Sequence, residues 1–442
     1  MAKREHEDTR ATQLFGHLAF SRRPLLLLAA LAFVPAVLLS GCGNSDDGNS
    51  SRLLTSWAAS HNLRETSGDL ADSSVRMIVR PTASGNSLRV RIENTLGTAP
   101  VSFSSAYVGV AASGAAIVPD TNLRLSFGGS QSLTLAPGAL AWSDPVNMEV
   151  QAFQRFAVSL HVTAASDVST HSLGLVTNYT ARGNQAAAVS GAGFSPINPV
   201  AQGTSVLAFP VYWVGAVDVV STTPGTIAAL GDSITDGRCS TTTNGGVLAG
   251  GVVVPDLYQR WTDILADRMA ALPADQRKAV ANAGIAGNRV VSGGNGPPAL
   301  ERLERDVLGL SGVTHVIFFE GTNDISGGAT GASVIAGSQQ ILDRLRARNI
   351  KVVGVTTIPR GQAGTGGFTA LQEQYRLEVN NWIRSPGRFD GVIDFDALLA
   401  GGGKSPTGAE IIKAEFNCDN IHPNAAGYAA MGRSINLDLF KN

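Results

Sequence analysis

The chain has 442 residues, more than one ordinary domain needs, so its length predicts two or three domains. The formal net charge is −1 and only 16% of the residues are charged. This balance provides no basic surface and excludes nucleic acid from the expected partners. The 50 glycines indicate many turns and therefore a large share of β structure.

The first 41 residues have the three parts of a signal peptide. A pair of arginines precedes an apolar run from Leu25 to Leu39, and small residues follow up to Cys42. The run is shorter than the roughly 20 residues that a membrane span needs. Its Leu-Ser-Gly-Cys ending resembles a bacterial lipobox, which implies cleavage before Cys42 and lipidation of that thiol. The alternative is an ordinary secretory peptide with a chance cysteine.

Residues 42–55 have the polar composition, rich in Gly, Ser, Asn and Asp, of a flexible tether. Together with the lipobox, this segment predicts an exported protein of the bacterial cell envelope, anchored to the membrane by a lipid on Cys42. The arginine pair also fits a twin-arginine export signal. The sequence leaves this route and general secretion both open.

Residues 56–222 are expected to form an accessory domain made of strands. Residues 87–93 alternate apolar and polar side chains, as a strand with one buried face does. Similar runs recur at 101–110, 123–127, 156–162 and 206–219. Turns rich in Gly, Pro, Asn and Asp separate them, and no helical stretch of useful length interrupts the region. We expect an all-β sandwich of the jelly-roll type.

Residues 223–442 are expected to form an α/β domain, because short apolar runs now alternate with helical ones. The predicted strands are 226–230, 279–282, 313–320, 351–358 and 391–395. The predicted helices are 261–272, 300–310, 332–348, 368–384 and 425–439. Five strands with intervening helices predict a three-layer α/β/α domain with a five-stranded parallel sheet. Ligands of such sheets bind beyond the carboxyl ends of the strands.

Two motifs at the ends of this domain have the residue types of a serine hydrolase. Ser233 follows the first predicted strand on a sharp turn, where a hydroxyl can stand exposed above the sheet. Asp419 precedes His422 by three residues, a spacing that lets a carboxylate orient and polarise an imidazole. That imidazole can take a proton from a serine that the fold brings to it. The chain has no Gly-x-Ser-x-Gly elbow, which argues against the standard α/β-hydrolase arrangement.

Acyl transfer also needs donors aimed at the developing oxyanion, each contributing about 3 kcal/mol of transition-state stabilisation. The turn after the second predicted strand can present the backbone N–H of Gly287, because glycine lets an oxygen approach closely. The turn after the third strand can present the side-chain amide of Asn323. Taken singly, each is an ordinary Gly/Asn turn. Their places at successive strand ends favour the functional interpretation.

Two further cysteines lie beside the two motifs. Cys239 follows Ser233 by six residues, and Cys418 directly precedes Asp419. Residues 241–251, just after the serine motif, are rich in Thr and Gly and form either a mobile lid over the site or a plain surface loop. If the motifs meet in space, the cysteines meet as well, and an exported protein can keep a disulfide. We expect a Cys239–Cys418 bridge, with two independent buried thiols as the alternative.

Other polar side chains have structural interpretations. Asp232 is expected to bond the backbone of its own turn, Asp324 to be structural, and His315 to be a core or interface residue. Asp394 and Asp396 flank the last predicted strand and would replace the motif acid only if that acid were misplaced. No cluster of His, Cys and Asp has metal-ligand spacing, so we expect no metal.

The order of these motifs resembles the GDSL or SGNH hydrolases, over residues 228 to about 431. The matching blocks are Gly-Asp-Ser at 231–233, Gly287, Gly-Thr-Asn-Asp at 321–324 and Asp-x-x-His-Pro-Asn at 419–424. The resemblance implies that Ser233 is the nucleophile, His422 the general base and then acid, and Asp419 the residue that orients it. It further implies an oxyanion hole made by the Ser233 N–H, the Gly287 N–H and the Asn323 side chain. Such an esterase requires no cofactor.

The β-rich half is similar, more loosely, to the N-terminal domain of secreted xylan-degrading esterases of this family. The stretches 89–94, 127–129 and 143–145 carry this likeness. The domain then either binds carbohydrate or walls the active site. Its tryptophans, Trp57, Trp142 and Trp213, are candidates for sugar stacking, although core packing is the interpretation that we favour.

The expected substrate is therefore a carboxylic ester, with acetyl or other short acyl esters on a polysaccharide placed first. Short-chain lipid or aryl esters are the second candidate. A third hypothesis is that the protein is a non-catalytic, carbohydrate-binding envelope lipoprotein that keeps an inactive hydrolase fold. The presence of all five motif residues, Ser233, Gly287, Asn323, Asp419 and His422, argues against that hypothesis.

Overall fold

The computed structural model describes residues 50–66, 70–165, 167–198, 200–202, 206–361 and 366–441. Asn49–Asn442 form one compact unit. The predicted signal peptide, the lipobox Cys42 and the first part of the predicted tether lie outside the described residues. Within the described ranges, no helix is both long enough and apolar enough to cross a membrane.

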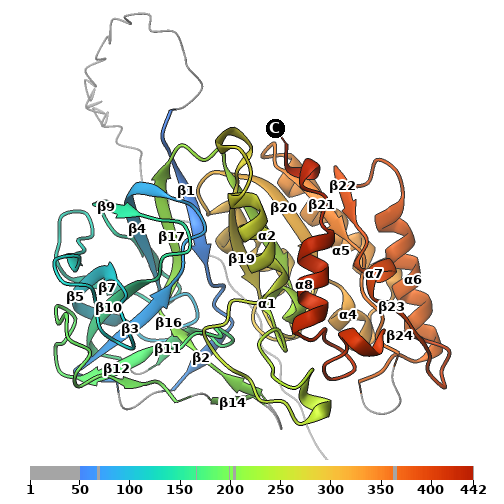
Figure 1. Cartoon of the computed structure of the whole chain (residues 1–442), viewed down its shortest axis with the longest axis horizontal. Coiled ribbons are helices and arrows are strands. Elements are labelled where there is room, and N and C mark those ends of the chain that lie inside the picture. The colour runs from blue at the N-terminus through green and yellow to red at the C-terminus, as the bar shows by residue number, and fades with distance from the viewer. Residues whose placement is uncertain are drawn as a thin grey trace, which may run out of the picture. The chain divides into compact units, whose positions relative to one another are not determined.

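The first half of the described chain consists of antiparallel strands (Figure 1). One sheet has the order β1-β17-β4-β8, with β9 also paired to β4, and its strands are β1 (Arg52–Ala58), β17 (Val214–Ser221), β4 (Gly85–Glu93), β8 (Leu140–Trp142) and β9 (Val146–Val150). A second sheet has the order β13-β12-β3-β10-β5-β6, with β7 also paired to β5. Its strands are β13 (Ser195–Pro196), β12 (Tyr179–Arg182), β3 (Ser73–Val79), β10 (Phe156–Ala164), β5 (Val101–Val110), β6 (Leu123–Arg124) and β7 (Leu133–Leu135). Smaller sheets are formed by β2 (Leu63–Glu65), β11 (Val168–His171) and β16 (Val211–Tyr212), and by β14 (Val200–Gln202) and β15 (Val206–Ala208).

The two large sheets share one hydrophobic core. Leu88, Val90 and Ile92 of β4 alternate with other side chains and are buried, as the period of a strand requires. They belong to the same apolar cluster as Val158 and Leu160 of β10 in the other sheet. The structure therefore confirms an all-β region that precedes the α/β domain.

Two boundaries in this region differ from the sequence-based expectation. β1 begins at Arg52, so the end of the predicted tether is strand: Leu54 is fully buried and pairs with Val219 of β17. The single strand expected over 206–219 is divided into β15, β16 and β17. Pro210 has no N–H to donate to a ladder, and Trp213 has a φ of 56°, so the chain turns at both points.

The second half has a five-stranded parallel sheet of order β19-β18-β20-β21-β22. The strands are β18 (Thr226–Gly231), β19 (Ala279–Gly284), β20 (Val313–Phe319), β21 (Lys351–Val355) and β22 (Gly391–Ile393). The α-helices are α1 (Ser233–Asp236), α2 (Trp261–Ala270), α3 (Ala299–Leu303), α4 (Thr322–Ser326), α5 (Gly331–Arg346), α6 (Ala370–Arg384), α7 (Phe395–Leu399) and α8 (Ala425–Ser434). A short hairpin joins β23 (Ala400–Lys404) to β24 (Glu410–Ile412).

Helices cover both faces of the parallel sheet. On one face, Leu303 of α3, Ile341 of α5 and Val379 of α6 pack in one cluster with side chains of the central strands. On the other face, Trp261 of α2 and Met431 of α8 pack in a second cluster with the remaining strand side chains. The central strands are buried on both sides, as a parallel sheet requires. The predicted three-layer α/β/α domain is therefore confirmed.

Several element ends also differ from expectation. β22 stops at Ile393 because Asp394 caps α7, its side chain accepting the N–H of Ala397. The helix expected over 300–310 changes after α3 into a π-helical turn, Glu304–Leu308. The helix expected over 425–439 ends at Ser434 and is followed by a 3₁₀ turn, Leu437–Phe440.

The β half and the α/β half are joined by buried polar contacts as well as by apolar packing. Thr55 of β1 donates its N–H to the Ser311 carbonyl, and its Oγ1 accepts the Ser311 N–H. Its own carbonyl accepts the hydroxyl of Thr226 in β18. These bonds fix β1 beside the sheet that carries the candidate site (Figure 1).

Candidate active site

Ser233 is the first residue of the short helix α1, directly beyond the carboxyl end of β18. Asp232 holds this turn, because its Oδ1 accepts the Ile234 N–H at 2.9 Å. Gly237 ends the helix in the left-handed region, with a φ of 104°. The Ser233 side chain is thus held at the edge of the sheet where ligands of such folds bind.

The hydroxyl of Ser233 meets the imidazole of His422. The distance from Ser233 Oγ to His422 Nε2 is 2.8 Å, although the two residues are 189 positions apart in the chain. Nδ1 of the same ring lies 2.8 Å from Asp419 Oδ2. Oδ1 of Asp419 also accepts the backbone N–H groups of Ile421 and His422, which locks the carboxylate against the ring. The three side chains form the serine, imidazole and carboxylate sequence of a proton-transfer chain.

The electrostatic surroundings leave the imidazole available as a base. Burial lowers the pKa of His422, and the charge and hydrogen bond of Asp419 oppose this only in part. Burial alone would raise the pKa of Asp419, but the His422 contacts and two backbone N–H donors hold it well below its ordinary value. At neutral pH, His422 is therefore neutral and Asp419 ionised.

A disulfide joins the loop after α1 to the loop that carries the acid. Cys239 and Cys418 are bonded, and their Cα atoms are 6.3 Å apart. The 3₁₀ turn Val247–Ala249 lies in the segment for which a lid was one interpretation. Its Leu248 N–H donates to the Cys418 carbonyl at 3.1 Å, so this part of the segment is attached to the acid loop. Sγ of Cys239 lies near Asp419 and His422, but a disulfide sulfur offers no thiolate to a metal.

The predicted oxyanion donors lie at the neighbouring strand ends. Gly287 follows β19 and has a φ of 79°, a conformation that favours glycine. One N–H of the Asn323 amide donates to the Asn288 carbonyl at 3.0 Å, and the Asn323 Oδ1 accepts from Arg360 at 3.3 Å. A primary amide has a second N–H. Among the described residues, no hydrogen bond uses the backbone N–H of Ser233 or of Gly287.

Residues 229–430 match the family model described as GDSL-like lipase/acylhydrolase. This segment of the chain is a GDSL-like lipase/acylhydrolase domain. The catalytic domain of the chain is accordingly a carboxylic ester hydrolase. No curated protein matches the chain.

Among solved structures, the chain is similar to a carbohydrate acetylesterase from Sinorhizobium meliloti, with 16% identity over 48% of this chain and 97% of that one, at a TM-score of 0.34. It is also similar to a family two carbohydrate esterase from Clostridium thermocellum in complex with cellohexaose. That comparison has 14% identity over 88% of this chain and 93% of that one, at a TM-score of 0.33. A psychrotrophic esterase from Pseudoalteromonas sp. is 18% identical over 48% of this chain and 93% of that one, at a TM-score of 0.34.

The remaining acids of the GDSL domain that were considered from the sequence have structural partners. Asp324 accepts the N–H groups of Val290 and Val291 and so shapes the loop after Gly287. Asp394 and Asp396 both accept from Arg384. They lie at the start of α7, whereas within the described ranges the carboxylate partner of the His422 ring is Asp419.

The other aromatic and histidine candidates are packed. His315 is buried in β20, with its ring edge against Phe440. Trp213 is fully buried, and Trp142 is partly buried beside the guanidinium of Arg89. Trp57 packs against the core of the β half. These contacts agree with a packing role for each of the three tryptophans.

Sequence reasoning missed several residues that contact the loops of the GDSL domain site, among them Arg360 and His171. Arg360, in the loop after β21, is buried and donates to Asn323. His171 comes from the β half and contacts Asp236 in α1. Neither residue lies in a motif, so no spacing signal pointed to them.

Proposed function

We propose that the chain is a serine esterase that removes acetyl or other short acyl groups from carbohydrate through an acyl-enzyme on Ser233. The contact of Ser233 Oγ with His422 Nε2 at 2.8 Å, with Asp419 behind the ring, is the observation that carries the proposal. The substrate class rests on the likeness of the β half to secreted xylan-degrading esterases.

The mechanism follows from the positions of the protons. Ser233 Oγ attacks the ester carbonyl carbon while its proton passes to His422 Nε2, and the carbonyl oxygen becomes an oxyanion. His422 then gives that proton to the leaving alcohol as the carbon–oxygen bond breaks. Water repeats the two steps on the acyl-enzyme and releases the acid. Throughout, His422 Nδ1 keeps its proton and donates it to Asp419.

The Ser233 N–H, the Gly287 N–H and the second N–H of Asn323 are proposed as the oxyanion donors. Their placement at the ends of β18, β19 and β20 supports this role. Arg360 accepts no hydrogen bond and contacts the amide oxygen of Asn323, so the amide nitrogen is the end left to donate.

The test is hydrolysis of p-nitrophenyl acetate by the wild-type protein and by Ser233→Ala. We expect the variant to lose at least about a thousandfold in kcat/KM with an unchanged melting temperature. Turnover equal to wild type would reject Ser233 as the nucleophile. A panel of acetylated xylan, acetylated cello-oligosaccharides, longer p-nitrophenyl esters and aryl esters would then rank the substrates. A preference for long acyl chains or simple aryl esters would reject the carbohydrate assignment.

We also propose that the protein is exported and lipid-anchored through Cys42. The proposal rests on the charged, apolar and small-residue sequence before that cysteine. The Cys239–Cys418 disulfide supports it, because disulfides persist in oxidising compartments. In a detergent phase partition, Cys42→Ala should move the protein into the aqueous phase. A wild-type protein that is already aqueous would contradict the anchor.

A further inference from the structure

One buried carboxylate connects two parts of the proposed active site. Asp236 is the last residue of α1, three positions after Ser233, and it is 2% exposed. Its Oδ2 accepts the backbone N–H of Ala286 at 2.7 Å, and Ala286 directly precedes Gly287. Asp236 therefore ties the helix of the nucleophile to the loop of a proposed oxyanion donor.

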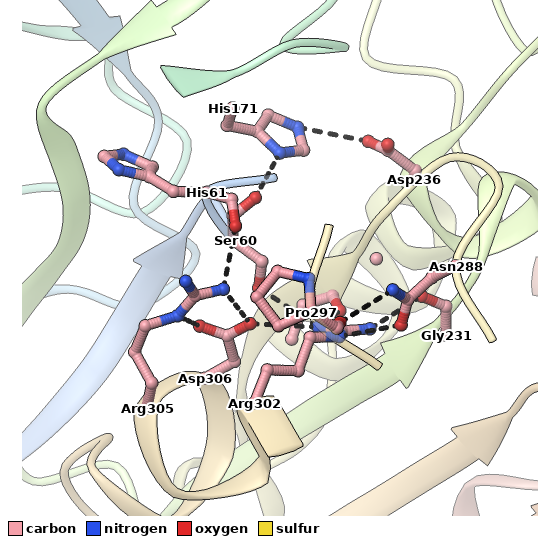
Figure 2. Close-up of polar contacts among 12 residues, drawn as sticks. Ser60, His61, His171, Gly231, Asp236, Asn288, Pro297, Arg302, Arg305 and Asp306 are labelled. Carbon is pink, nitrogen blue, oxygen red and sulfur yellow. Dashed lines mark hydrogen bonds and ion pairs between the residues drawn. The ribbon is translucent and has the colours of Figure 1, made fainter. Parts of the chain in front are cut away.

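The other oxygen of that carboxylate is held by the β half. His171, at the end of β11, places Nε2 3.1 Å from Asp236 Oδ1, and its Nδ1 lies 2.7 Å from the Ser60 carbonyl (Figure 2). A carbonyl and a carboxylate both accept hydrogen bonds, so both ring nitrogens of His171 must donate. The ring is then an imidazolium that forms an ion pair with Asp236.

The state of the ring agrees with its surroundings. Burial lowers the pKa of His171, but the charge and hydrogen bond of Asp236 and the Ser60 carbonyl together raise it above its ordinary value. Arg260 also lies close to Asp236, and its Nε donates to the Asp236 backbone carbonyl at 2.6 Å. It does not bond the carboxylate, so His171 is the cation that directly contacts it within the described part of the chain.

A second set of hydrogen bonds links Ser60 of the β half to the proposed active site. Arg302 donates to Gly231 O at 3.0 Å, just before the nucleophile turn, and to Asn288 Oδ1 at 2.9 Å, just after Gly287 (Figure 2). It also lies 3.4 Å from the hydroxyl of Ser60. Ser60 thus meets both His171 and Arg302, and the β half supports the loops on both sides of the proposed oxyanion site.

We propose that His171 is a positioning residue for ester hydrolysis, acting through Asp236 on the Ala286–Gly287 peptide and on α1. The proposal rests on the function proposed above. Oxyanion donors stabilise a transition state only when they are preorganised, and a displacement of about 1 Å can cost about a hundredfold in rate. The imidazolium also compensates the buried negative charge of Asp236, which lies near the place where the oxyanion forms. Without the imidazolium, the Asp236 carboxylate would repel the developing oxyanion.

His171→Gln is the variant that tests this role, because glutamine keeps a side-chain donor and removes the charge. On p-nitrophenyl acetate we expect kcat to fall roughly 10- to 100-fold, with KM within about twofold because ground-state binding is unaffected. The inhibition constant of an aliphatic trifluoromethyl ketone, which forms an anionic hemiketal on a serine, should rise by a similar factor. A role in folding alone would lower the melting temperature without changing kcat, KM or the inhibition constant.

His161→Gln is the matched control. His161 is a second histidine of the β half and pairs with an aspartate in the same way, its Nε2 lying 3.0 Å from Asp72 Oδ1. The Asp72 side chain is 80% exposed, and the hydrogen-bond partners of the His161 ring, Ser104 and Asp72, both belong to the β half. We expect wild-type kcat, KM and inhibitor affinity in this variant.

The double variant His171→Gln/Asp236→Asn provides the rescue test. The new amide at 236 can still accept the Ala286 N–H and gives the glutamine a neutral partner, so no buried charge is left unpaired. Its kcat should recover several-fold over His171→Gln and stay below wild type by about threefold or more. If His171→Gln does not fold, wild-type kcat in the double variant overturns the proposal.

Ser233→Ala, measured in the same assay, separates a failure of the positioning role of His171 from a failure of the esterase assignment. Wild-type kcat in folded His171→Gln, together with an inactive Ser233→Ala, overturns the positioning role and leaves the esterase assignment in place. Full activity in Ser233→Ala overturns both. A selective fall in kcat in His171→Gln, with the control unchanged, supports the role.

Discussion

At the scale of single residues, the site depends on a neutral imidazole between a hydroxyl and a carboxylate. Burial lowers the pKa of His422, and Asp419 opposes that effect. The pH dependence of kcat/KM reports the base of the free enzyme. Because the pKa of His422 is lowered, its base form persists below the ordinary imidazole value of about 6.5. The acid limb of the profile should therefore have its midpoint below that value.

Asp419→Asn should change rate and pH dependence in separate ways. Removing the carboxylate removes the interaction that raises the pKa of His422, so the midpoint of the acid limb should move to lower pH. The rate on the plateau should fall by about 10²- to 10⁴-fold, because the ring loses the acceptor that orients it. The measurement is kcat/KM for p-nitrophenyl acetate between about pH 4 and 9.

Asp394→Asn is the control for this prediction. Asp394 was the substitute acid considered from the sequence, and in the structure it caps α7 and pairs with Arg384. Its replacement should leave the midpoint and the plateau unchanged. A midpoint that rises in Asp419→Asn, or a change equal in both variants, would reject Asp419 as the partner of the imidazole.

At the scale of elements, the site is a consequence of three successive strand ends. β18, β19 and β20 run parallel, so the turns that follow them meet at one edge of the sheet. Their apolar runs, bounded by Gly and Asn, made both the strands and this convergence predictable from the sequence. Ser233, Gly287 and Asn323 lie at these ends for that reason.

Some features of the structure could not be predicted from the hydrophobic pattern of the sequence, and each has a physical cause. The capping of α7 by Asp394 and the π-helical turn after α3 depend on local hydrogen bonds that leave no hydrophobic period. The contact of His171 with Asp236 joins residues 65 positions apart in different halves. Strand alternation fixes which side chains are buried in each half, but it holds no information on how the halves meet. The same limit applies to Arg302 and Ser60.

The Cys239–Cys418 bridge should stabilise both the fold and the site. It closes a loop with a sequence separation of 179, and cross-links of this kind contribute about 2 to 5 kcal/mol. Cys239→Ala/Cys418→Ala should lose stability of this size in urea unfolding. We also expect a lower kcat, because the loop with Asp419 is no longer tied to the loop after α1.

A reducing agent provides the comparison for the bridge. It should lower the unfolding midpoint of the wild-type protein toward that of the double variant and have no effect on the variant itself. Equal midpoints for oxidised wild type and double variant would show that the bridge does not contribute to stability.

At the scale of the whole molecule, the two halves behave as one structural unit. Asp218 of β17 is fully buried at their junction. Its carboxylate accepts hydrogen bonds from the Thr55 hydroxyl at 2.6 Å and from the Arg89 guanidinium at 2.9 Å. It also accepts one from the hydroxyl of Ser311, in the α/β half, at 2.7 Å. The ionic partner Arg89 belongs to the β half, and the Ser311 hydroxyl of the α/β half donates to Asp218 and accepts from Arg89. Unfolding either half breaks these hydrogen bonds of a buried ion pair, which couples the two halves.

The stretches 89–94, 127–129 and 143–145 have a structural role in this unit. Asp144 accepts the N–H groups of Gly128 and Gly129, and Ser143 exchanges hydrogen bonds with Val90. The three stretches therefore contact one another and build one part of the sandwich. These contacts give the three stretches a packing role within the β half.

Asp218→Asn should lower the stability of the whole described unit. We expect a loss of about 3 kcal/mol, because Arg89 loses its ionic partner in a buried setting. Scanning calorimetry should show one transition in both proteins, shifted to lower temperature in the variant. Asp438→Asn, at a surface ion pair with Lys441, should change stability by less than about 1 kcal/mol. Two separate transitions in the wild-type protein would contradict the coupling.

The most direct test of the account is the site at which an organophosphate reacts. Incubation with diethyl p-nitrophenyl phosphate, followed by intact-mass and peptide analysis, reports which hydroxyl is made nucleophilic by an adjacent base. We predict a single diethylphosphoryl group on Ser233, formed at a rate that falls sharply when His422 is replaced by alanine. Modification of another residue, or labelling of Ser233 at an equal rate in His422→Ala, would contradict the account.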